Sequence, residues 1–265
     1  RSTTTTTFTT RSALEQSVQD FEIIVVDNGS TDNTPELLRR FQKVFRQHRI
    51  PLSVITNSMN AGGPAGRNQA LEQASGRYVI FMDNDVMAGS RDWLIRLKTV
   101  LQQRPDAGMV GPKLIYAAPP HRIQCAGVGI SRTGRVLFMG RGMDADAAEF
   151  SREREVQALI SACVIFPRSI YEIVGEMDTA FHPVQFEDLD YCYRIRQNGY
   201  KIIYTPAVGM YHWESMTTAG APQLNNAYNV AKNSLIFKRK WRHVFANEDG
   251  PGDNEAVWKG WDVNR

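Results

Sequence analysis

Two aspartates spaced two residues apart are the first candidates for chemistry. Asp83 and Asp85 directly follow the apolar run Tyr78–Met82, which has the pattern of a strand buried on both faces. Because side chains alternate along a strand, both carboxylates are expected to point to one side and to need a neutralising cation. Carboxylate oxygens select hard ions such as Mg²⁺ or Mn²⁺, and Mg²⁺ usually comes with substrate phosphates. The alternative, a polar turn that merely ends the strand, stays open on the triplet alone.

Two acids and a histidine farther along the chain are the other candidates. Glu187 and Asp188 stand at the start of a predicted helix, where acids interact favourably with the helix dipole. That structural role and a role as general base, which accepts a proton from an attacking hydroxyl, are both open. His212 follows a predicted strand, where a histidine is more often structural. Beside two aspartates and a metal, however, its neutral imidazole can serve as a ligand.

A glycine-rich loop, Asn60–Gly66, precedes a predicted helix that begins at Arg67. Glycines before a helix let backbone N–H groups reach a phosphate. The spacing is neither that of a Walker loop nor that of a dinucleotide fingerprint, so a plain turn is an equally good interpretation of this loop by itself.

Strands and helices that alternate along the chain would position these residues. Short apolar runs predict the strands, and capped amphipathic stretches predict the helices between them. Thr34 is expected to cap the first helix, with Pro35 at its first position. The alternation is typical of a doubly wound α/β sheet, in which ligands bind beyond the carboxyl ends of the strands. The predicted strands are Phe21–Val26, Leu52–Thr56, Tyr78–Met82, Gly108–Ile115, Ala158–Phe166, Tyr200–Tyr204 and Val208–Tyr211, and predicted helices begin near Thr34, Arg67, Ser90, Pro167 and Glu187.

The composition is that of an ordinary soluble globular protein. The chain has 265 residues, of which 42% are hydrophobic and 22% charged, enough for one large domain or two small ones. A net charge of +3 is too small to indicate a nucleic-acid partner. No apolar run reaches the roughly 18 residues of a membrane span. Three scattered cysteines, Cys125, Cys163 and Cys192, are expected to be reduced in a cytoplasmic protein.

Three segments depart from the alternating pattern. Arg1–Thr10 is of low complexity, with five consecutive threonines, and is interpreted as a tag, a truncation scar or a poorly determined stretch. Residues 117–155 suggest excursions over the surface, which in compact enzymes are often substrate loops. Residues 232–242 predict a basic helix. It is either a solvated face or a contact with a phosphate-bearing acceptor or an anionic membrane.

Taken in order, these residues resemble the family 2 glycosyltransferases of the GT-A fold. The resemblance runs from about Asp20 to Trp241, and the ordered set of pieces is more specific than any one of them. The spacing from His212 to the helix around Lys232 and Asn233 is most similar to the rhamnosyl- and galactofuranosyltransferase-like branch. The pieces are Phe21–Ser30, Asn60 with Gly62 and Gly63, Arg67 and Asn68, Gly76–Tyr78, Asp83–Asp85, Phe186–Tyr191, Arg194, Gly199 and Tyr200, and Tyr211 and His212.

The resemblance implies a GT-A, Rossmann-like α/β fold, with a mixed, mostly parallel sheet flanked by helices and a C-terminal acceptor-binding part. Residues 1–115 would form the half that binds the nucleotide sugar, with an N-terminal strand that is missing or altered. Residues 116–245 would bind the acceptor and supply the catalytic base, and residues 246–265 would form a polar tail.

The resemblance also implies a role for each candidate residue. Asp85, His212 and Asp83 would hold Mn²⁺ or Mg²⁺ as the cofactor. Asp188 would be the catalytic base, and Glu187 would orient the acceptor. The nucleotide-sugar site would be formed by Asp27 and Asn28 at the base and ribose, by Asn60, Gly63 and Arg67, and by Asp83 at the ribose or diphosphate.

These roles imply an inverting displacement at the anomeric carbon. The donor would be a UDP- or dTDP-sugar, the acceptor a glycan or a lipid-linked molecule, and the setting glycan or polysaccharide assembly. The enzyme would be cytoplasmic, and one interpretation of Lys232–Arg242 places it peripherally on the inner face of the membrane. Because the reaction is a transfer to an acceptor, the carboxylate spacing rules of glycoside hydrolases do not apply.

Two departures from the family pattern leave other functions open. Family members usually carry an acid at the position of Asn28, so the resemblance does not fix the base of the donor. Relatives also begin with an apolar strand for which there is no room before Asp20. The alternatives are therefore a non-catalytic sugar-nucleotide-binding module of a larger assembly, or a nucleotidyltransferase, which also uses carboxylates and Mg²⁺.

Overall fold

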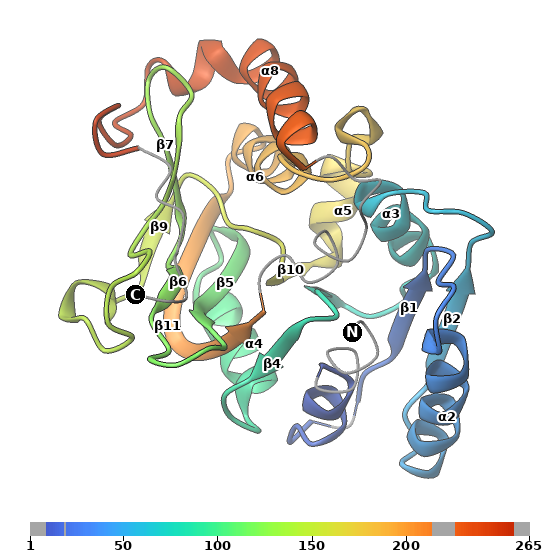
Figure 1. The fold of residues 1–265 in the computed structure, drawn as a ribbon. Coiled ribbons are helices and arrows are strands. Elements are labelled where there is room, and N and C mark those ends of the chain that lie inside the picture. The colour runs from blue at the N-terminus through green and yellow to red at the C-terminus, as the bar shows by residue number, and fades with distance from the viewer. Residues whose placement is uncertain (1–8, 19, 214–225, 257–265) are drawn as a thin grey trace.

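A seven-stranded sheet forms the centre of the fold (Figure 1). The computed structural model describes residues 9–18, 20–213 and 226–256. The sheet has the path β3-β10-β5-β11-β4, with β6 beside β5 and β9 beside β11. Its strands are β3 (Tyr78–Met82), β4 (Val86–Ala88), β5 (Ala107–Tyr116), β6 (Ile123–Cys125), β9 (Arg154–Val156), β10 (Cys163–Pro167) and β11 (Lys201–His212).

The directions of the main strands confirm the predicted mixed, mostly parallel sheet. β10 is antiparallel to both β3 and β5, and β5 is parallel to β11. Three of these four strands, β3, β5 and β11, therefore run in one direction, and only β10 opposes them. The carboxyl ends of β3 and β11 consequently lie at the same edge of the sheet, which is where ligands bind in such folds.

A second, two-stranded sheet stands beside the first. β1 (Ile23–Asp27) and β2 (Leu52–Thr56) pair in parallel, and no backbone pairing joins β1 to β3 in the described part of the chain. The four aliphatic residues of β1 are only half-buried, as expected for a strand with one open edge. The prediction of a missing or altered N-terminal strand falls largely on residues 1–8, which lie outside the described residues, and it stays a prediction.

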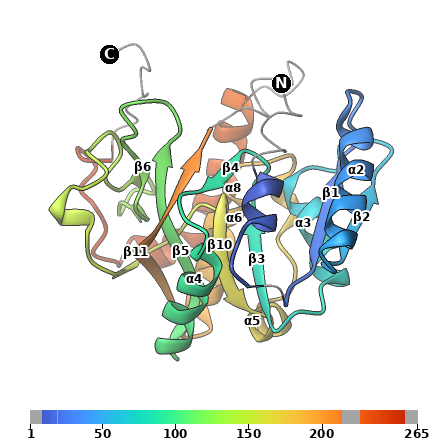
Figure 2. The ribbon, with the colours of Figure 1, turned by 90° about the horizontal axis from the view of Figure 1, so that it is seen from below.

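Helices cover both faces of the large sheet (Figure 2). α4 (Trp93–Gln103) packs on one face, and α5 (Arg168–Val174) and α6 (Glu187–Gln197) pack on the other. α3 (Gly63–Gln73) lies against β1, and α2 (Thr34–Gln47) lies against β2. α8 (Asn226–Phe245) joins the core through aromatic contacts, with the Tyr193 ring centroid 5.4 Å from Phe237 and 5.3 Å from Trp241.

Several element boundaries differ from the predicted ones. Thr34 is the first residue of α2 rather than its cap. Asn33 takes the cap position, and the Asp32 carboxylate accepts a hydrogen bond from the Thr34 N–H at 2.9 Å. Helix α4 begins at Trp93 after Asp92, not near Ser90. The two strands predicted at 200–204 and 208–211 are one strand, β11, with a register shift between Thr205 and Gly209.

The stretch at 117–155, read from the sequence as surface excursions, contains short regular elements. Two of its strands, β6 and β9, extend the large sheet, and two others form a separate antiparallel pair. These short strands have no long periodic pattern, so the sequence did not predict them. The remaining elements are β7 (Val128–Ile130), β8 (Val136–Phe138), η1 (Ala148–Phe150) and η2 (Thr179–Phe181). The predicted division of the chain at residues 115 and 116 stays a prediction.

Candidate active site

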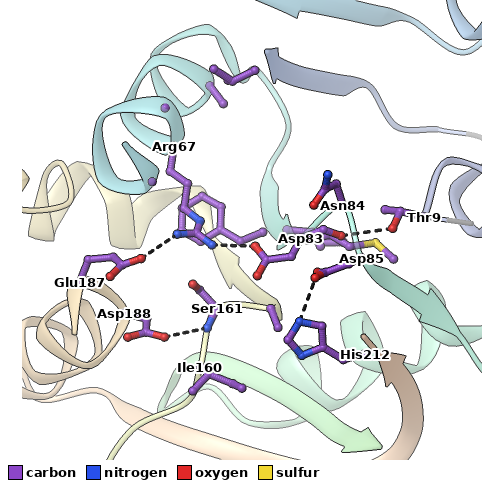
Figure 3. Close-up of a pocket in the computed structure, with 18 of the residues that line it drawn as sticks. Thr9, Arg67, Asp83, Asn84, Asp85, Ile160, Ser161, Glu187, Asp188 and His212 are labelled. Atoms are coloured by element: carbon purple, nitrogen blue, oxygen red, sulfur yellow. Dashed lines mark hydrogen bonds and ion pairs between the residues drawn. The ribbon is translucent and has the colours of Figure 1, made fainter. Parts of the chain in front are cut away.

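Three of the predicted residues form a cluster with the donor atoms of a metal site (Figure 3). Asp83 and Asp85 lie in the turn that connects β3 to β4, and His212 is the last residue of β11. In the sheet, His212 lies opposite Val86 of β4, which brings the imidazole beside the turn. One carboxylate oxygen of each aspartate and one imidazole nitrogen all lie within 4.8 Å of one another. The two carboxylate oxygens suit a hard divalent ion, and the imidazole nitrogen can complete its ligand set.

The position of the His212 ring is set from both of its nitrogens. Nε2 lies 3.2 Å from Asp85 Oδ1, and Nδ1 lies 2.7 Å from Gln124 Oε1 on β6. With Gln124 placed in this way, Nδ1 donates its proton to Oε1, and in the neutral imidazole Nε2 then turns a lone pair toward the Asp85 carboxylate. In that form of the ring, a cation between the lone pair and the carboxylate stabilises both. The cluster therefore fits a divalent metal.

Gln124 was not among the predicted site residues. It is buried on a three-residue strand in the stretch at 117–155, and no sequence pattern marks it. Only its contact with His212, 88 positions along the chain, indicates a role. The sequence offered no signal that could have identified it.

Arg67 connects the metal cluster to the pair of downstream acids. One end of its guanidinium lies 2.8 Å from Asp83 Oδ1 and the other lies 3.2 Å from Glu187 Oε1. The guanidinium also lies over the Phe81 ring, 5.6 Å from its centroid. Gly63 leaves room for this bridge, since a Cβ there would approach both Arg67 Nη1 and Glu187 Oε1 to 3.4 Å. The Arg67 guanidinium thus links the Asp83–Asp85–His212 cluster to the Glu187–Asp188 pair.

The acid pair lies at the start of α6, as predicted, with its two carboxylates in different surroundings. Glu187 is buried, and its Oε2 has no hydrogen-bond partner among the described residues. Asp188 is half-buried; its Oδ2 accepts a hydrogen bond from the Ser161 N–H at 3.2 Å and its Oδ1 accepts one from Leu189 at 2.8 Å. Figure 3 shows Glu187 turned toward Arg67 and Asp188 toward Ser161.

Burial sets the acidity of both carboxyl groups. It raises the pKa of Glu187 to about 7, helped by the neighbouring Asp188 charge and opposed by Arg67. It also raises the pKa of Asp188 above its ordinary value, again against the effect of Arg67. Both carboxyl groups therefore bind a proton more readily than ordinary exposed acids do, as expected for groups at a functional site.

Three of the residues predicted at the nucleotide lie at the end of β1 and in the glycine-rich loop before α3. The Asp27 carboxylate accepts from the Ser30 N–H at 2.9 Å, and the Asn60 side chain accepts from the Gly62 N–H at 2.9 Å. The Asn28 amide donates to the Gly62 carbonyl at 3.2 Å. These contacts shape the loops, while contact with a nucleotide stays a prediction for all three residues.

A network of neutral amides surrounds Asn28. Its Oδ1 accepts a hydrogen bond from Asn57 Nδ2 at 2.8 Å, and Asn57 exchanges two further bonds with Gln69, at 2.9 and 3.0 Å. Asn57 and Gln69 were not among the predicted site residues, because nothing in their local spacing indicates that the end of β2 contacts α3. The hydrogen-bond partners of the Asn28 side chain are therefore uncharged groups.

All of the predicted site residues line one cleft. It extends from the loops after β1, past the glycine-rich loop and the turn after β3, to the start of α6 and the first turns of α8. The chain thus brings together every residue predicted for the nucleotide, the metal and the base. They are Asp27, Asn28, Asn60, Gly63, Arg67, Asp83, Asp85, Glu187, Asp188 and His212.

Comparison with known families decides the classification. A model of the family described as Glycosyl transferase family 2 matches residues 4–137, half of the chain. The chain belongs to this family. The matched range contains Arg67 and the Asp83–Asp85 turn but ends before the acid pair and His212. The predicted family is therefore confirmed, while the finer branch stays a prediction.

Curated relatives of this family 2 chain are much longer than the chain itself. An uncharacterized protein, y4gI, of Sinorhizobium fredii is 32% identical over 238 residues, which are 86% of this chain and 25% of the relative. The O-antigen biosynthesis protein RfbC of Myxococcus xanthus is 30% identical over 203 residues, 74% of this chain and 15% of the relative. The chain thus spans a quarter or less of the length of these two relatives.

Solved structures confirm the GT-A fold. A structure of GalNAc-T7 with UDP, GalNAc and Mn²⁺ matches 76% of this chain and 39% of its own, with a TM-score of 0.62 and 15% identity. A mannosyltransferase from Pyrobaculum calidifontis with GDP-Man and Mn²⁺ matches 91% of this chain and 60% of its own, with a TM-score of 0.61 and 19% identity. At these identities the likeness concerns the fold alone.

Proposed function

We propose that this chain carries out sugar transfer from a nucleoside-diphosphate donor to a hydroxyl of a glycan or lipid-linked acceptor, with inversion at the anomeric carbon. One observation carries the proposal: Arg67 binds Asp83 of the metal cluster and Glu187 of the acid pair at once. Donor-binding and proton-accepting groups therefore face one cleft. Relatives described as an O-antigen biosynthesis protein and a poly(ribitol-phosphate) beta-glucosyltransferase support a role in polysaccharide assembly.

The metal part of the proposal rests on the donor set of this chain. Asp83, Asp85 and His212 would hold Mn²⁺ or Mg²⁺, and Gln124 would keep the imidazole in the required tautomer. When bound, such an ion supplies positive charge that stabilises a departing diphosphate. The two structural neighbours described with Mn²⁺ support the same cofactor. Asp83 also pairs with Arg67, which adds a fixed positive charge beside the cluster.

Asp188 is the proposed general base. It is half-buried at the cleft, and its raised pKa makes it a stronger base than an ordinary aspartate. It would take the proton of the acceptor hydroxyl while that oxygen bonds to the anomeric carbon. The bond from this carbon to the diphosphate oxygen breaks, and the electron pair leaves with the nucleoside diphosphate. Glu187, held by Arg67, would orient the acceptor.

The donor base is proposed to be uracil or thymine, recognised near Asn28. Its amide can accept a hydrogen bond from the imide N–H of either base, although without the charge of an acid. The neighbours described with UDP and with GDP-Man do not separate these bases from guanine. A panel of UDP-, dTDP- and GDP-sugars, titrated calorimetrically with Mn²⁺ present, tests this choice. Tight binding of a GDP-sugar alone would overturn it.

The rate of transfer is expected to fall as the pH decreases through about 7, because the pKa of Glu187 is about 7 and Glu187 then loses the charge that pairs with Arg67. The pKa of Asp188 is also raised, so this carboxyl is protonated, and unable to act as a base, up to a higher pH than usual. A profile of kcat/KM against pH from 5 to 9, at saturating Mn²⁺, checks this prediction. A rate that stays constant down to pH 5 would contradict it.

The raised pKa of Glu187 is also expected to make the stability of the fold depend on pH. Because the folded state binds the Glu187 proton more tightly than the unfolded state, this group destabilises the fold as the pH rises from 4.5 through about 7. Replacement Glu187→Gln removes that titration. The difference in melting temperature between the variant and the parent should therefore move in favour of the variant between pH 5 and pH 8. A difference that is independent of pH would show that Glu187 is ionised throughout.

A membrane contact through α8 is also proposed, over a narrower surface than the predicted residues 232–242. Lys240 lies 2.9 Å from Asp178 and 2.8 Å from Asp190, and Lys232 donates to the His182 carbonyl. These two lysines are therefore engaged within the fold. One exposed stripe of α8 includes Tyr228, Leu235, Arg239 and Arg242. None of the helices in the described ranges is long and apolar enough to cross a bilayer.

Removal of two charges from this stripe tests the contact. The double change Arg239→Gln and Arg242→Gln is expected to reduce co-sedimentation with anionic vesicles at low salt, since each basic residue near such a surface contributes about 1 kcal/mol. The control is Arg39→Gln with Lys43→Gln, an exposed basic pair on α2. Equal losses in both variants, or no binding of the parent, would contradict a contact through α8.

A further inference from the structure

The backbone that leads into the acid pair is strained. Gln185 and Phe186 have φ angles of 89° and 72°, in the left-handed region that residues other than glycine rarely adopt. Phe186 is the cap residue of α6, immediately before Glu187. A turn of this kind persists only where its surroundings hold it. The contacts that hold it therefore also set the direction in which Glu187 and Asp188 point.

One buried side chain on α8 binds three carbonyl groups of this turn. Asn233 is fully buried, and its Nδ2 lies 2.7 Å from the Phe181 carbonyl oxygen, 2.9 Å from that of Val184 and 3.0 Å from that of Gln185. An amide nitrogen has two hydrogens, so the three carbonyls share them. The Asn233 Oδ1 has no hydrogen-bond partner among the described residues. The side chain thus acts toward the turn only as a donor.

The glycine-rich loop holds the same turn from the other side. The Gly63 N–H donates to the Pro183 carbonyl at 2.7 Å, and the Ala61 carbonyl lies 3.1 Å from His182 Nδ1. The fit is tight, because a Cβ on Gly62 would lie 2.6 Å from His182 Nδ1 and 2.9 Å from the Pro183 oxygen. The turn at residues 181–186 is therefore clamped between α8 and the loop that leads to Arg67.

We propose that Asn233 is a positioning residue for the catalytic pair. It touches neither substrate nor metal; by fixing the turn at residues 181–186, it orients Asp188 toward the acceptor hydroxyl and Glu187 toward Arg67. The proposal rests on the proposed function of Asp188. It also couples two parts of the cleft, because Asn226 and Val230 in the first turns of α8 line the same cleft as the acid pair.

Kinetics of Asn233→Ala test the proposal. We expect kcat to fall at least tenfold, with the donor KM and the affinity for nucleoside diphosphate with Mn²⁺ changed less than threefold, and with a shifted acid limb of the pH profile. The matched control is Asn229→Ala, a buried asparagine one turn earlier on α8 with no hydrogen bond to the turn among those described. It should keep the kcat and the pH profile of the parent.

A conservative variant keeps the test decisive if the alanine variant does not fold. Asn233→Ser retains one donor in a smaller side chain, and its kcat is expected to lie between those of the parent and of the alanine variant. Parent values of kcat and of the pH profile in the folded alanine or serine variant would overturn the proposal. A loss of kcat matched by an equal loss of donor affinity would also overturn it, because it indicates general damage.

A measurement without turnover separates this proposal from the proposed function. Hydrogen exchange of the peptide amides in residues 181–190 should be faster in Asn233→Ala or Asn233→Ser than in Asn229→Ala, while α4 exchanges equally in all variants. If the parent transfers no sugar but this difference is found, the function is wrong and the clamp on the turn is correct. If the exchange is equal in all variants, Asn233 does not hold the turn.

Discussion

Asp188→Asn is expected to leave donor binding nearly unchanged and to lower kcat by at least about 10²-fold, the low end for the loss of a general base. The change is nearly isosteric. The amide oxygen can still accept one of the two backbone hydrogen bonds that hold the carboxylate, from Ser161 and Leu189. Only the charge and the basicity are removed. Steady-state release of nucleoside diphosphate gives kcat, and calorimetry gives the donor affinity.

Two further variants make this result specific. Asp146→Asn changes an exposed aspartate in the same way and should retain the parent kcat. Glu187→Gln removes one of the two carboxylate charges that pair with Arg67. It should raise the acceptor KM more than it lowers kcat, because Glu187 is proposed to orient the acceptor rather than to take its proton. If Asp188→Asn keeps turnover within a few-fold of the parent, Asp188 is only an acid at a helix terminus and the base lies elsewhere.

Asp85→Ala is expected to abolish metal-dependent binding of a nucleoside diphosphate. The variant removes one of three donor groups and leaves His212 Nε2 without its carboxylate partner at 3.2 Å. Since carboxylates supply most of the charge that binds Mg²⁺ or Mn²⁺, the remaining pair should hold the ion poorly. Calorimetric titrations of a nucleoside diphosphate, with and without Mn²⁺, measure the difference directly.

Asn84→Ala is the matched control for the metal site. Asn84 lies in the same turn, but its side chain points away from the three donor groups (Figure 3). The control should keep a Mn²⁺-dependent gain in affinity, whereas Asp85→Ala should lose it. Equal affinity of Asp85→Ala and the parent in the presence of Mn²⁺ would contradict the metal assignment.

Local pattern predicted the strands in which β-branched and aromatic residues prevail. The bounds of β2, Leu52–Thr56, and β3, Tyr78–Met82, agree with the prediction because such residues make up most of both runs. The long strand β11 was predicted as two strands, whereas the structure continues it through Pro206. The sheet tolerates it through the register shift that follows Thr205.

The types and the order of the residues along the chain predicted which residues belong to the site. They did not predict which of these residues contact one another. Arg67 was predicted to hold the nucleotide, and the structure shows it bound to Asp83 and Glu187, 16 and 120 positions away. Helical or strand periodicity does not predict ion pairs between residues so far apart in the sequence. Thr9 illustrates the same limit. Thr9 belongs to the segment of low complexity at the start of the chain. Its hydroxyl nevertheless donates to the Val86 carbonyl at 2.6 Å, next to the turn that carries Asp83 and Asp85.

The identity of the released nucleotide product tests the central claim most directly. The full chain is incubated with Mn²⁺, a panel of nucleotide sugars and an acceptor glycan fraction, and the products are resolved by chromatography. Sugar transfer predicts a nucleoside diphosphate that forms only when both acceptor and metal are present, and that Asp188→Asn does not form. Release of pyrophosphate would instead identify a nucleotidyltransferase. Tight binding of a nucleotide sugar without any release, whatever the acceptor, would identify a non-catalytic binding module.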